Sequence, residues 1–374
     1  MRIKKLVSIG CGVLLSQAVV FAQSGSAQVV DVAAGGELRV SLPKGDVVIH
    51  VWDRNQVSVV ADGVDRNGLR VEKSGNTVEV TLGGRGGRWG DVEIEISVPR
   101  RFTLDIGTGG GDVAIQGDLE GLLEVSTSGG DIDFNDVQGE VRVTTHGGDV
   151  DGGDVSGDSD VRSHGGDISL GNVGGKLDVT THGGDIELRE VGGDLLAKTL
   201  GGDIDATRVG GRADLTTQGG DINLDSVAAE ATLRTAGGDI SMRTAEGSVT
   251  AQTAGGDVEF RSVRGWINAV TAGGDIEVEL IPAGSQGSTL ESRGGDVTLI
   301  LPADARVTVE ARVRIRGFWK GKEDDYGIDA EFATTQYDER DTEIIGTYQI
   351  NGGGPVIQIE TVNGMIRLLK SRQR

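Results

Sequence analysis

The tripeptide Gly-Gly-Asp recurs along this chain at a spacing that hardly varies. Its Asp stands at positions 112, 131, 149, 167, 185, 203, 221, 239, 257, 275 and 296, and the eight spacings from 131 to 275 are all 18 residues. A fixed period of this length indicates a repeat architecture in which each unit stacks on the next. Residues 107–300 show no apolar stripe at i, i+3, i+4 and i+7, which argues against helical repeats.

Each repeat unit contains two short runs of alternating apolar residues. One unit is DIDFNDVQGEVRVTTHGG, residues 131–148, and a further Gly at its eighth position after the Asp divides it into halves of nine. Its apolar residues are Ile132, Phe134, Val137, Val141 and Val143. Short strands cannot bury a face alone, but parallel stacking of coil on coil builds continuous aliphatic ladders. We therefore predict an all-β, right-handed parallel β-solenoid of 18-residue coils, flattened into two sheets and ~50 Å long at the usual strand spacing.

The composition agrees with an ordered β-repeat protein. The 374 residues include 63 Gly but only 5 Pro, which excludes collagen, and 37% hydrophobic residues exclude a disordered acidic chain. So much Gly indicates many turns, since Gly reaches positive φ without steric cost. The 13 Phe, Trp and Tyr residues are few, as expected for a narrow interior filled by Val, Ile, Leu and Ala.

The flanks of the repeat do not keep its register. Residues 23–106 alternate as strands without the 18-residue spacing, and we predict an N-terminal antiparallel β cap that protects the first edge of the solenoid. The repeat itself covers residues 107–300. Residues 301–374 predict a C-terminal β cap with an irregular insertion at 313–343, where many of the aromatic residues lie.

Residues 1–22 predict a cleavable secretory signal peptide. The segment has a basic start, a short apolar run, and Val20-Phe21-Ala22 before Gln23. It contains Cys11, the chain's one Cys, whose acylation would be a lipoprotein alternative. Cleavage removes three basic residues and no acidic residue, so the formal charge falls from −22 to −25. No later apolar run is long enough for a transmembrane segment. We expect a periplasmic, cell-surface or extracellular protein that does not bind nucleic acid, since an acidic chain repels phosphate.

The order of these elements resembles a known family. The strand VVIHVWDRNQVSVVA, the step EIEISVPRRFTLDIGTGGGDV into the coils, the exit GGDVTLILPADARVTVEARV and the ending INGGGPVIQIETVNGMIRLLK are similar to the bacterial domain DUF4097, also called “putative adhesin” or toastrack. The resemblance implies a β-helical envelope protein that acts as an interaction scaffold or in envelope stress, without established catalytic residues.

The repeat places its Asp residues in one row along the rod. Neighbouring carboxylates at strand spacing repel by roughly 1 kcal/mol per pair even at the dielectric constant of water, so something must offset the repulsion. Each carboxylate could accept backbone N–H groups of its own Gly-rich turn, or Ca²⁺ could bind between coils. The calcium candidates are Asp131, Asp149, Asp167, Asp185, Asp203, Asp221, Asp239, Asp257 and Asp275.

Two further rows follow the same register. Thr and Ser residues at 127, 145, 163, 181, 199, 217, 235, 253 and 271 share the parity of the inward positions, so we expect their methyls inside and their hydroxyls bonded along the stack. His146, His164 and His182 occupy one register in three successive coils. They are transition-metal candidates for Zn²⁺, Cu²⁺ or Ni²⁺, and the alternative is a polar residue duplicated with its repeat.

No motif in the sequence indicates catalysis. The mature chain has no Cys nucleophile, no G-x-S-x-G and no H-E-x-x-H, and its Gly pairs do not open helices. We expect no enzyme and no established cofactor, but an exported adhesin-like or scaffold module that binds envelope proteins or glycans along its acidic surface. The alternatives are a glycan-active β-helical enzyme, with residues 313–343 as the place for its site, and a structural spacer without a partner.

Overall fold

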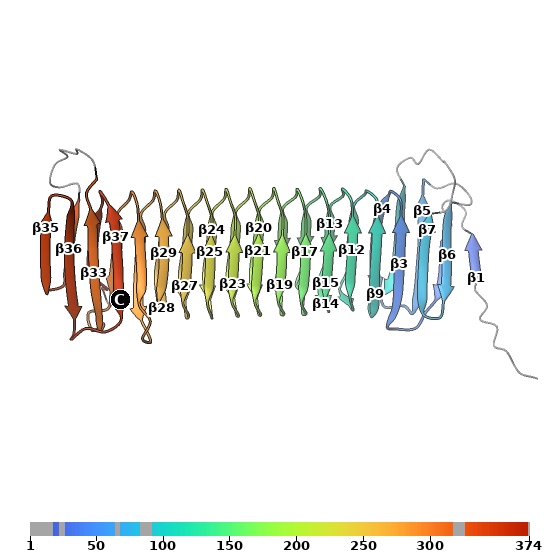
Figure 1. Ribbon diagram of the computed structural model, residues 1–374. Helices are drawn as coiled ribbons and strands as arrows, with labels where there is room; N and C mark the ends of the chain where they lie inside the picture. Colours follow the sequence, from blue (N-terminus) through green and yellow to red (C-terminus); the bar gives the residue numbers. More distant parts are fainter. Residues whose placement is uncertain (1–17, 22–26, 64–67, 83–91, 317–325, 373–374) are drawn as a thin grey trace, which may run out of the picture.

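The computed structural model describes residues 18–21, 27–63, 68–82, 92–316 and 326–372. These residues form strands, turns and loops but no helix, and they build one straight rod (Figure 1). Two long sheets, here called sheet A and sheet B, contain 19 and 17 strands of the described chain. The prediction of an all-β solenoid with two sheets is confirmed.

Each coil of the repeat gives one strand to each sheet, and each strand pairs in parallel with its counterpart in the next coil. In sheet A these strands are β9 (Phe102–Thr108), β12 (Leu123–Thr127), β15 (Val141–Thr144), β17 (Ser159–Arg162), β19 (Leu177–Thr180), β21 (Leu195–Lys198), β23 (Ala213–Thr216), β25 (Ala231–Arg234), β27 (Val249–Gln252), β29 (Ile267–Thr271) and β31 (Ser288–Ser292). In sheet B they are β10 (Val113–Gln116), β13 (Ile132–Phe134), β16 (Val150–Gly152), β18 (Ile168–Leu170), β20 (Ile186–Val191), β22 (Ile204–Val209), β24 (Ile222–Val227), β26 (Ile240–Ala245), β28 (Val258–Gly265), β30 (Ile276–Pro282) and β32 (Val297–Leu301).

The core lies between the two sheets. The alternating apolar positions of the repeat are buried, and in the first full unit they are Ile132, Phe134, Val137, Val141 and Val143, none more than 5% exposed. The Val at the sixth position stacks at a corner, where β11 (Leu119–Glu120) pairs with β14 (Val137–Gln138) and single bridges continue the column to Val191. With the pairings that follow, one aliphatic ladder runs along this corner from Leu119 to Leu280.

The glycines of the regular coils serve close packing, and the expectation that they supply positive φ is wrong between Gly121 and Gly265. No residue between Gly121 and Gly265 has a positive φ. A Cβ on Gly148 would lie 2.1 Å from the carbonyl oxygen of Gly130 in the preceding coil, whereas one on Gly147 would meet nothing nearer than 3.7 Å. The second Gly of the pair is required because the backbones of stacked coils touch at this corner.

The N-terminal cap is only partly antiparallel, which corrects the expectation. The strand β3 (Gly36–Leu42) pairs in parallel with β9 and with β7 (Thr77–Leu82), and β4 (Asp46–Trp52) pairs in parallel with β10 and with β8 (Glu93–Pro99). Two coils of the cap thus continue the solenoid. The antiparallel strands lie outside them: β6 (Leu69–Ser74) on β7, β5 (Gln56–Asp62) on β8, and β2 (Gln28–Asp31) on β5. Lys73 Nζ donates to the carbonyl of Asp31 at 2.5 Å and joins the two sheets at this end.

The C-terminal cap changes the order of the chain in space. The coil formed by β37 (Val356–Val362) and β38 (Met365–Lys370) stacks directly on β31 and β32. The coil formed by β33 (Val307–Arg314) and β34 (Gly327–Ala330) precedes it in sequence but lies outside it. Two antiparallel strands, β36 (Glu343–Ile350) and β35 (Gln336–Arg340), then extend sheet A. The segment 313–343, expected to be irregular, therefore includes strands; its residues 317–325 lie outside the described chain.

The predicted signal peptide lies mostly outside the described residues, as does its Cys11. Its residues 18–21 form β1 (Ala18–Phe21), which pairs antiparallel with β6 at the end of sheet A. Cleavage after Ala22 stays a prediction.

Candidate functional site

The Asp row forms a hydrogen-bonded ladder along one corner of the rod. Oδ1 of each Asp accepts the backbone N–H of the equivalent Asp in the next coil, at 2.9 Å from Asp149 N to Asp131 Oδ1 and 2.7 Å from Asp257 N to Asp239 Oδ1. The ladder starts at Asp46 in the N-terminal cap and ends where Asp296 accepts from Met365. Each carboxylate is thus held by the next coil. This corrects the interpretation of the sequence in which each carboxylate accepts N–H groups of its own turn. A charge-assisted bond at every coil offsets the repulsion along the row.

The same hydrogen bond from a backbone N–H to a carboxylate of the preceding coil recurs at a second corner in the first coils. Asp136 Oδ1 accepts from Asp154 N at 2.9 Å, and Asp154 Oδ1 accepts from Asn172 N at 2.8 Å and from the Asn172 side-chain amide at 3.1 Å. These bonds from Asn172 lower the pKa of Asp154.

The Thr and Ser row is buried and structural, as expected. All nine side chains are at most 8% exposed. The Thr145 hydroxyl donates to the carbonyl of Gly130 in the preceding coil at 3.0 Å and accepts from Gly148 N at 3.3 Å. The row therefore secures the corner beside the Asp ladder.

The three His residues are exposed and stacked on one another. The rings of His146 and His164 are parallel within 3° with centroids 4.7 Å apart, and His164 and His182 are 5.0 Å apart with planes at 52°. The structure thus brings together the three side chains that the sequence placed in one register.

Among the described residues, no group of three or more His, Cys, Asp or Glu side chains is gathered around one point as metal ligands. In the Asp ladder one oxygen of each carboxylate accepts a backbone N–H, and in the His row the rings of His146 and His164 lie face to face while His182 is tilted. Calcium at the Asp row and a transition metal at the His row stay predictions.

Sheet B carries a shallow recess of about 670 Å³ over its first coils. The strands β13, β16 and β18 are only three residues long here, and Gly152, Gly153 and Gly171 are among the residues that line the recess. Asp133 and Asp151 are register neighbours at this recess. Burial and, after it, the charges of Asp151, Asp131 and Asp112 raise the pKa of Asp133.

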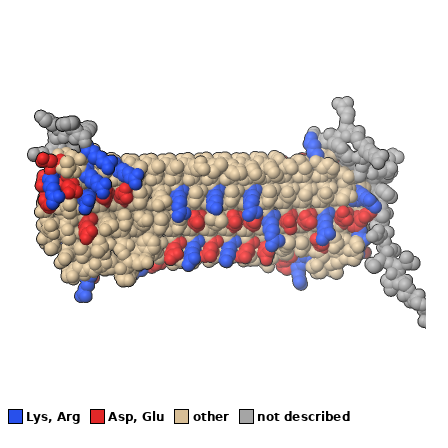
Figure 2. Space-filling view, viewed as in Figure 1, with Lys and Arg blue, Asp and Glu red and all other residues tan. Residues whose placement is uncertain are grey.

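The outer faces of the rod carry acidic and basic side chains in rows. Figure 2 shows Lys and Arg alternating with Asp and Glu along the middle of the rod, and both gathered again over the C-terminal cap at the left. Arg162 contacts Asp160 at 2.5 Å and Asp178 in the next coil at 3.9 Å, and Arg234 contacts Asp214 at 3.7 Å. Each pair is exposed, so each adds little stability by itself.

The architecture of repeated coils between two β caps is that of a known family. The family model described as Toastrack DUF4097 matches residues 36–211 and 193–331. The chain belongs to the DUF4097 family. The resemblance seen in the sequence is confirmed, and two overlapping matches along one DUF4097 chain are what its repeated coils would produce. No functionally curated protein matches this chain.

Three solved structures are similar to parts of it. A “putative adhesin” from Bacteroides fragilis is 17% identical, with a TM-score of 0.23 over 78% of this chain and 100% of the other. A “putative cell adhesion protein” from Clostridium sporogenes is 9% identical, with a TM-score of 0.16 over 93% and 100%. A “putative lipid binding protein” from Parabacteroides distasonis is 10% identical, with a TM-score of 0.20 over 94% and 98%. At such low TM-scores these likenesses carry no functional argument.

Reasoning from the sequence did not identify the outward charged row of sheet A or the hollows in the two sheet faces. Parity along each strand could have revealed the row, because Asp160, Asp178 and Asp214 share one outward position of the unit. The hollow over the C-terminal cap depends on which strands lie side by side, and the 18-residue register does not give that order in the caps. Within the described chain no helix is long and apolar enough to cross a membrane.

Proposed function

We propose that the mature protein is an exported, non-catalytic module of the adhesin or scaffold type, whose flat polar faces bind protein or glycan partners of the cell envelope. The observation that carries this proposal is the array of outward charged side chains on sheet A, which includes at least one charged residue on every strand from β12 to β25 (Figure 2). Single exposed contacts are weak, but contacts repeated along a rigid rod add up for a long partner by multivalency. A predicted signal peptide and the adhesin label of the DUF4097 family are consistent with this role.

The experiment is crosslinking in cells that express the full-length chain, followed by purification and mass spectrometry of the captured partners. Two matched charge-removal variants distinguish the faces, each serving as the control for the other. Arg or Lys is replaced by Gln on sheet A at Arg142, Arg162, Lys198 and Arg234, or on sheet B at Arg189, Arg208, Arg243 and Arg261.

We expect partners to be captured reproducibly and one variant to lose them while the other keeps them. Capture of nothing specific would overturn the proposal in favour of a spacer. Release of reducing sugars from envelope or plant polysaccharides, lost when residues 313–343 are removed, would overturn it in favour of a glycan-active enzyme.

A further inference from the structure

The C-terminal cap contains a hollow of about 420 Å³ on the outer face of sheet A. Four neighbouring strands, β31, β37, β33 and β36, form its floor, and they come from four separate stretches of the chain. This volume lies in the range of ~300–1,000 Å³ that small-molecule sites occupy. The hollow is therefore large enough for a ligand, and it exists only because the cap changes the order of its strands.

Two rows of outward side chains cross these strands in register. The first row is Thr289, Gln358, Glu310 and Thr347, and the second is Glu291, Glu360, Arg312 and Ile345. The hollow thus contains hydroxyl, amide, carboxylate and guanidinium groups beside one aliphatic side chain, Ile345, which is half-buried.

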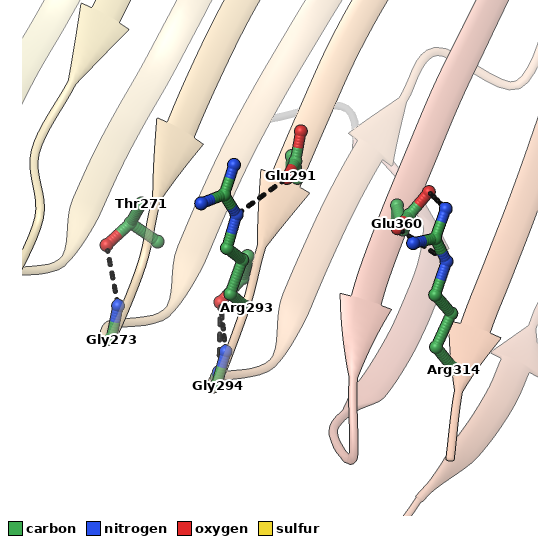
Figure 3. A network of polar contacts seen from close by, with 9 residues as sticks. Thr271, Gly273, Glu291, Arg293, Gly294, Arg314 and Glu360 are labelled. Carbon is green, nitrogen blue, oxygen red and sulfur yellow. Dashed lines mark hydrogen bonds and ion pairs between the residues drawn. The ribbon is translucent and has the colours of Figure 1, made fainter. Parts of the chain in front are cut away.

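Two of the carboxylates are held in place by arginines at the edge of the hollow. Arg314 binds Glu360 through two bonds, Nε to Oε1 at 2.8 Å and a terminal nitrogen to Oε2 at 3.0 Å. Arg293 binds Glu291 through Nε to Oε1 at 3.0 Å. Figure 3 shows both pairs on neighbouring strands. The two Glu side chains are about one-third exposed, so this wall of the hollow is ordered before any ligand arrives.

The remaining polar groups are less engaged. Glu310 and Arg312 are exposed on the same strand, and the acid closest to Arg312 is Glu343 at 3.9 Å. The Thr289 and Thr347 hydroxyls and the Gln358 amide can each donate and accept. Acceptors, donors and a small apolar surface are therefore available within one hollow.

The charges of these groups determine which kind of ligand the hollow can bind. The carboxylates of Glu291, Glu360 and Glu310 are balanced by Arg293, Arg314 and Arg312, so these groups carry no net charge that would favour an anion or a simple cation. A neutral polyhydroxylated ligand suits all of them, because its hydroxyls donate to carboxylates and accept from Arg, Gln and Thr, and its C–H face packs on Ile345.

We infer that this hollow is a binding site for a neutral saccharide. The inference rests on the proposed function, since it names the glycan as partner and the C-terminal cap as the place of contact. The regular faces of the rod would then supply additional contacts to a longer chain.

The test uses the mature protein on a printed panel of neutral oligosaccharides of N-acetylglucosamine, glucose, mannose and galactose, with sulfated and sialylated counterparts. The neutral oligosaccharide retained best is then titrated in solution by calorimetry. The variants within the hollow are Glu310→Gln, Arg312→Leu and Thr347→Arg, which fills it. The controls are Glu230→Gln and Arg212→Leu, the same changes at exposed turn positions outside the hollow and outside the strands of both sheets. Thermal unfolding identifies any variant that fails to fold.

We expect at least about a tenfold loss of affinity for Glu310→Gln and Arg312→Leu, no measurable binding for Thr347→Arg, and no more than about a twofold change for the controls. Retention of acidic glycans only, or unchanged binding by the three hollow variants, would overturn this site. If no glycan binds but crosslinking captures proteins, the saccharide inference is wrong and the proposed function stands. If both experiments fail, both proposals fall.

Discussion

The repeat coils and the C-terminal cap use the same stacking contacts, but they differ in how chain order relates to spatial order. In the repeat, the neighbour of a strand is the strand that the next coil along the chain gives to the same sheet, as β31 is to β29. In the cap, β37 lies against β31 although β33 to β36 come between them in the chain. The Asp ladder and the Thr hydroxyl bond nevertheless continue: Met365 N donates to Asp296 at 2.8 Å, and Thr361 donates to the Gly295 carbonyl at 2.6 Å. These contacts depend on the geometry of stacked coils and not on sequence adjacency.

The two regions also use glycine for different reasons. In the repeat, Gly148 is needed because a side chain would collide with the neighbouring coil. In the cap, Gly352 has a φ of +91° and open space where a Cβ would stand, and Asn351 beside it has a φ of 48°. The cap turns the chain back on itself, which requires the left-handed region, whereas the regular coils between Gly121 and Gly265 advance without it.

The largest expected effect separates these two uses of glycine. Gly148→Ala should destabilise the protein by about 3 kcal/mol or more, because the added Cβ would lie 2.1 Å from the backbone carbonyl oxygen of Gly130. Gly352→Ala in the cap should cost about 1–2 kcal/mol through backbone strain. Gly147→Ala is the matched control and should change the free energy of unfolding little. Chemical denaturation measures all three, and equal effects of Gly147→Ala and Gly148→Ala would contradict the packing explanation.

Within the repeat, one inward position departs from the aliphatic ladder. Gly152 makes room for the ring of Phe134 in the preceding coil, since a Cβ there would lie 2.3 Å from the ring and 2.6 Å from Leu170. Gly152→Leu should therefore cost about 1–3 kcal/mol by overpacking. Adding Phe134→Ala should recover part of this loss, which a double-mutant cycle of unfolding free energies would measure. Additive effects would show that the two sites do not compensate.

A smaller effect tests whether repeat and cap share the hydroxyl bond. Thr145→Val in the repeat and Thr361→Val in the cap should each cost about 1–2 kcal/mol, because each leaves a buried or partly buried carbonyl without its donor. Thr144→Val, whose side chain is less buried, is the control. A much smaller cost at Thr361 would show that the cap does not depend on the stacking contacts of the repeat.

Two carboxylates in the repeat should respond to pH in opposite directions. Because the pKa of Asp133 is raised, this carboxyl favours the folded state at low pH and loses that contribution as the pH rises through its pKa. At neutral pH its charge therefore destabilises the fold, and Asp133→Asn should stabilise the protein by about 0.2–1 kcal/mol. The lowered pKa of Asp154 means that its contribution is present at neutral pH and is lost as pH falls through that pKa, so Asp154→Asn should destabilise slightly. Melting curves should show both differences shrinking near pH ~3, where the carboxylates protonate.

The smallest expected effects concern metal ions at the two exposed rows. If Ca²⁺ binds the Asp row, the unfolding midpoint of the mature protein should rise in millimolar Ca²⁺ and fall with a chelator. Unchanged midpoints would reject that site. If the His row binds Zn²⁺, His164→Ala should abolish it, and His50→Ala in the cap is the control. Undiminished Zn²⁺ stoichiometry in His164→Ala would exclude these ligands.

The regular part of the fold was predictable because the register repeats. Once Ile132 and Val150 occupy equivalent positions 18 residues apart, parallel pairing and burial follow from strand alternation. The caps were less predictable. A parallel neighbour such as β9 lies more than sixty residues from β3 in the chain, and no period marks that pairing.

The candidate sites divide in the same way. The sequence placed His146, His164 and His182 in one row, and the structure stacks them. It also aligned the Asp residues, but it did not reveal that each carboxylate binds the next coil. A bond within the same turn and a bond to the next coil are both compatible with the 18-residue spacing. The hollow over the cap had no signal at all in the sequence, since Thr289, Glu310, Thr347 and Gln358 belong to four separate strands.

By itself, the sequence determined the solenoid, its two sheets, its buried ladders and its DUF4097 family. Short alternating strands with a strict 18-residue period bury their apolar side chains when equivalent strands stack in parallel, coil on coil. Only the tertiary structure decided how the ends close, why the second Gly of each pair has no space for a side chain, and which outward groups meet in the cap. Those features depend on contacts between coils distant in sequence, where local propensity and period carry no information.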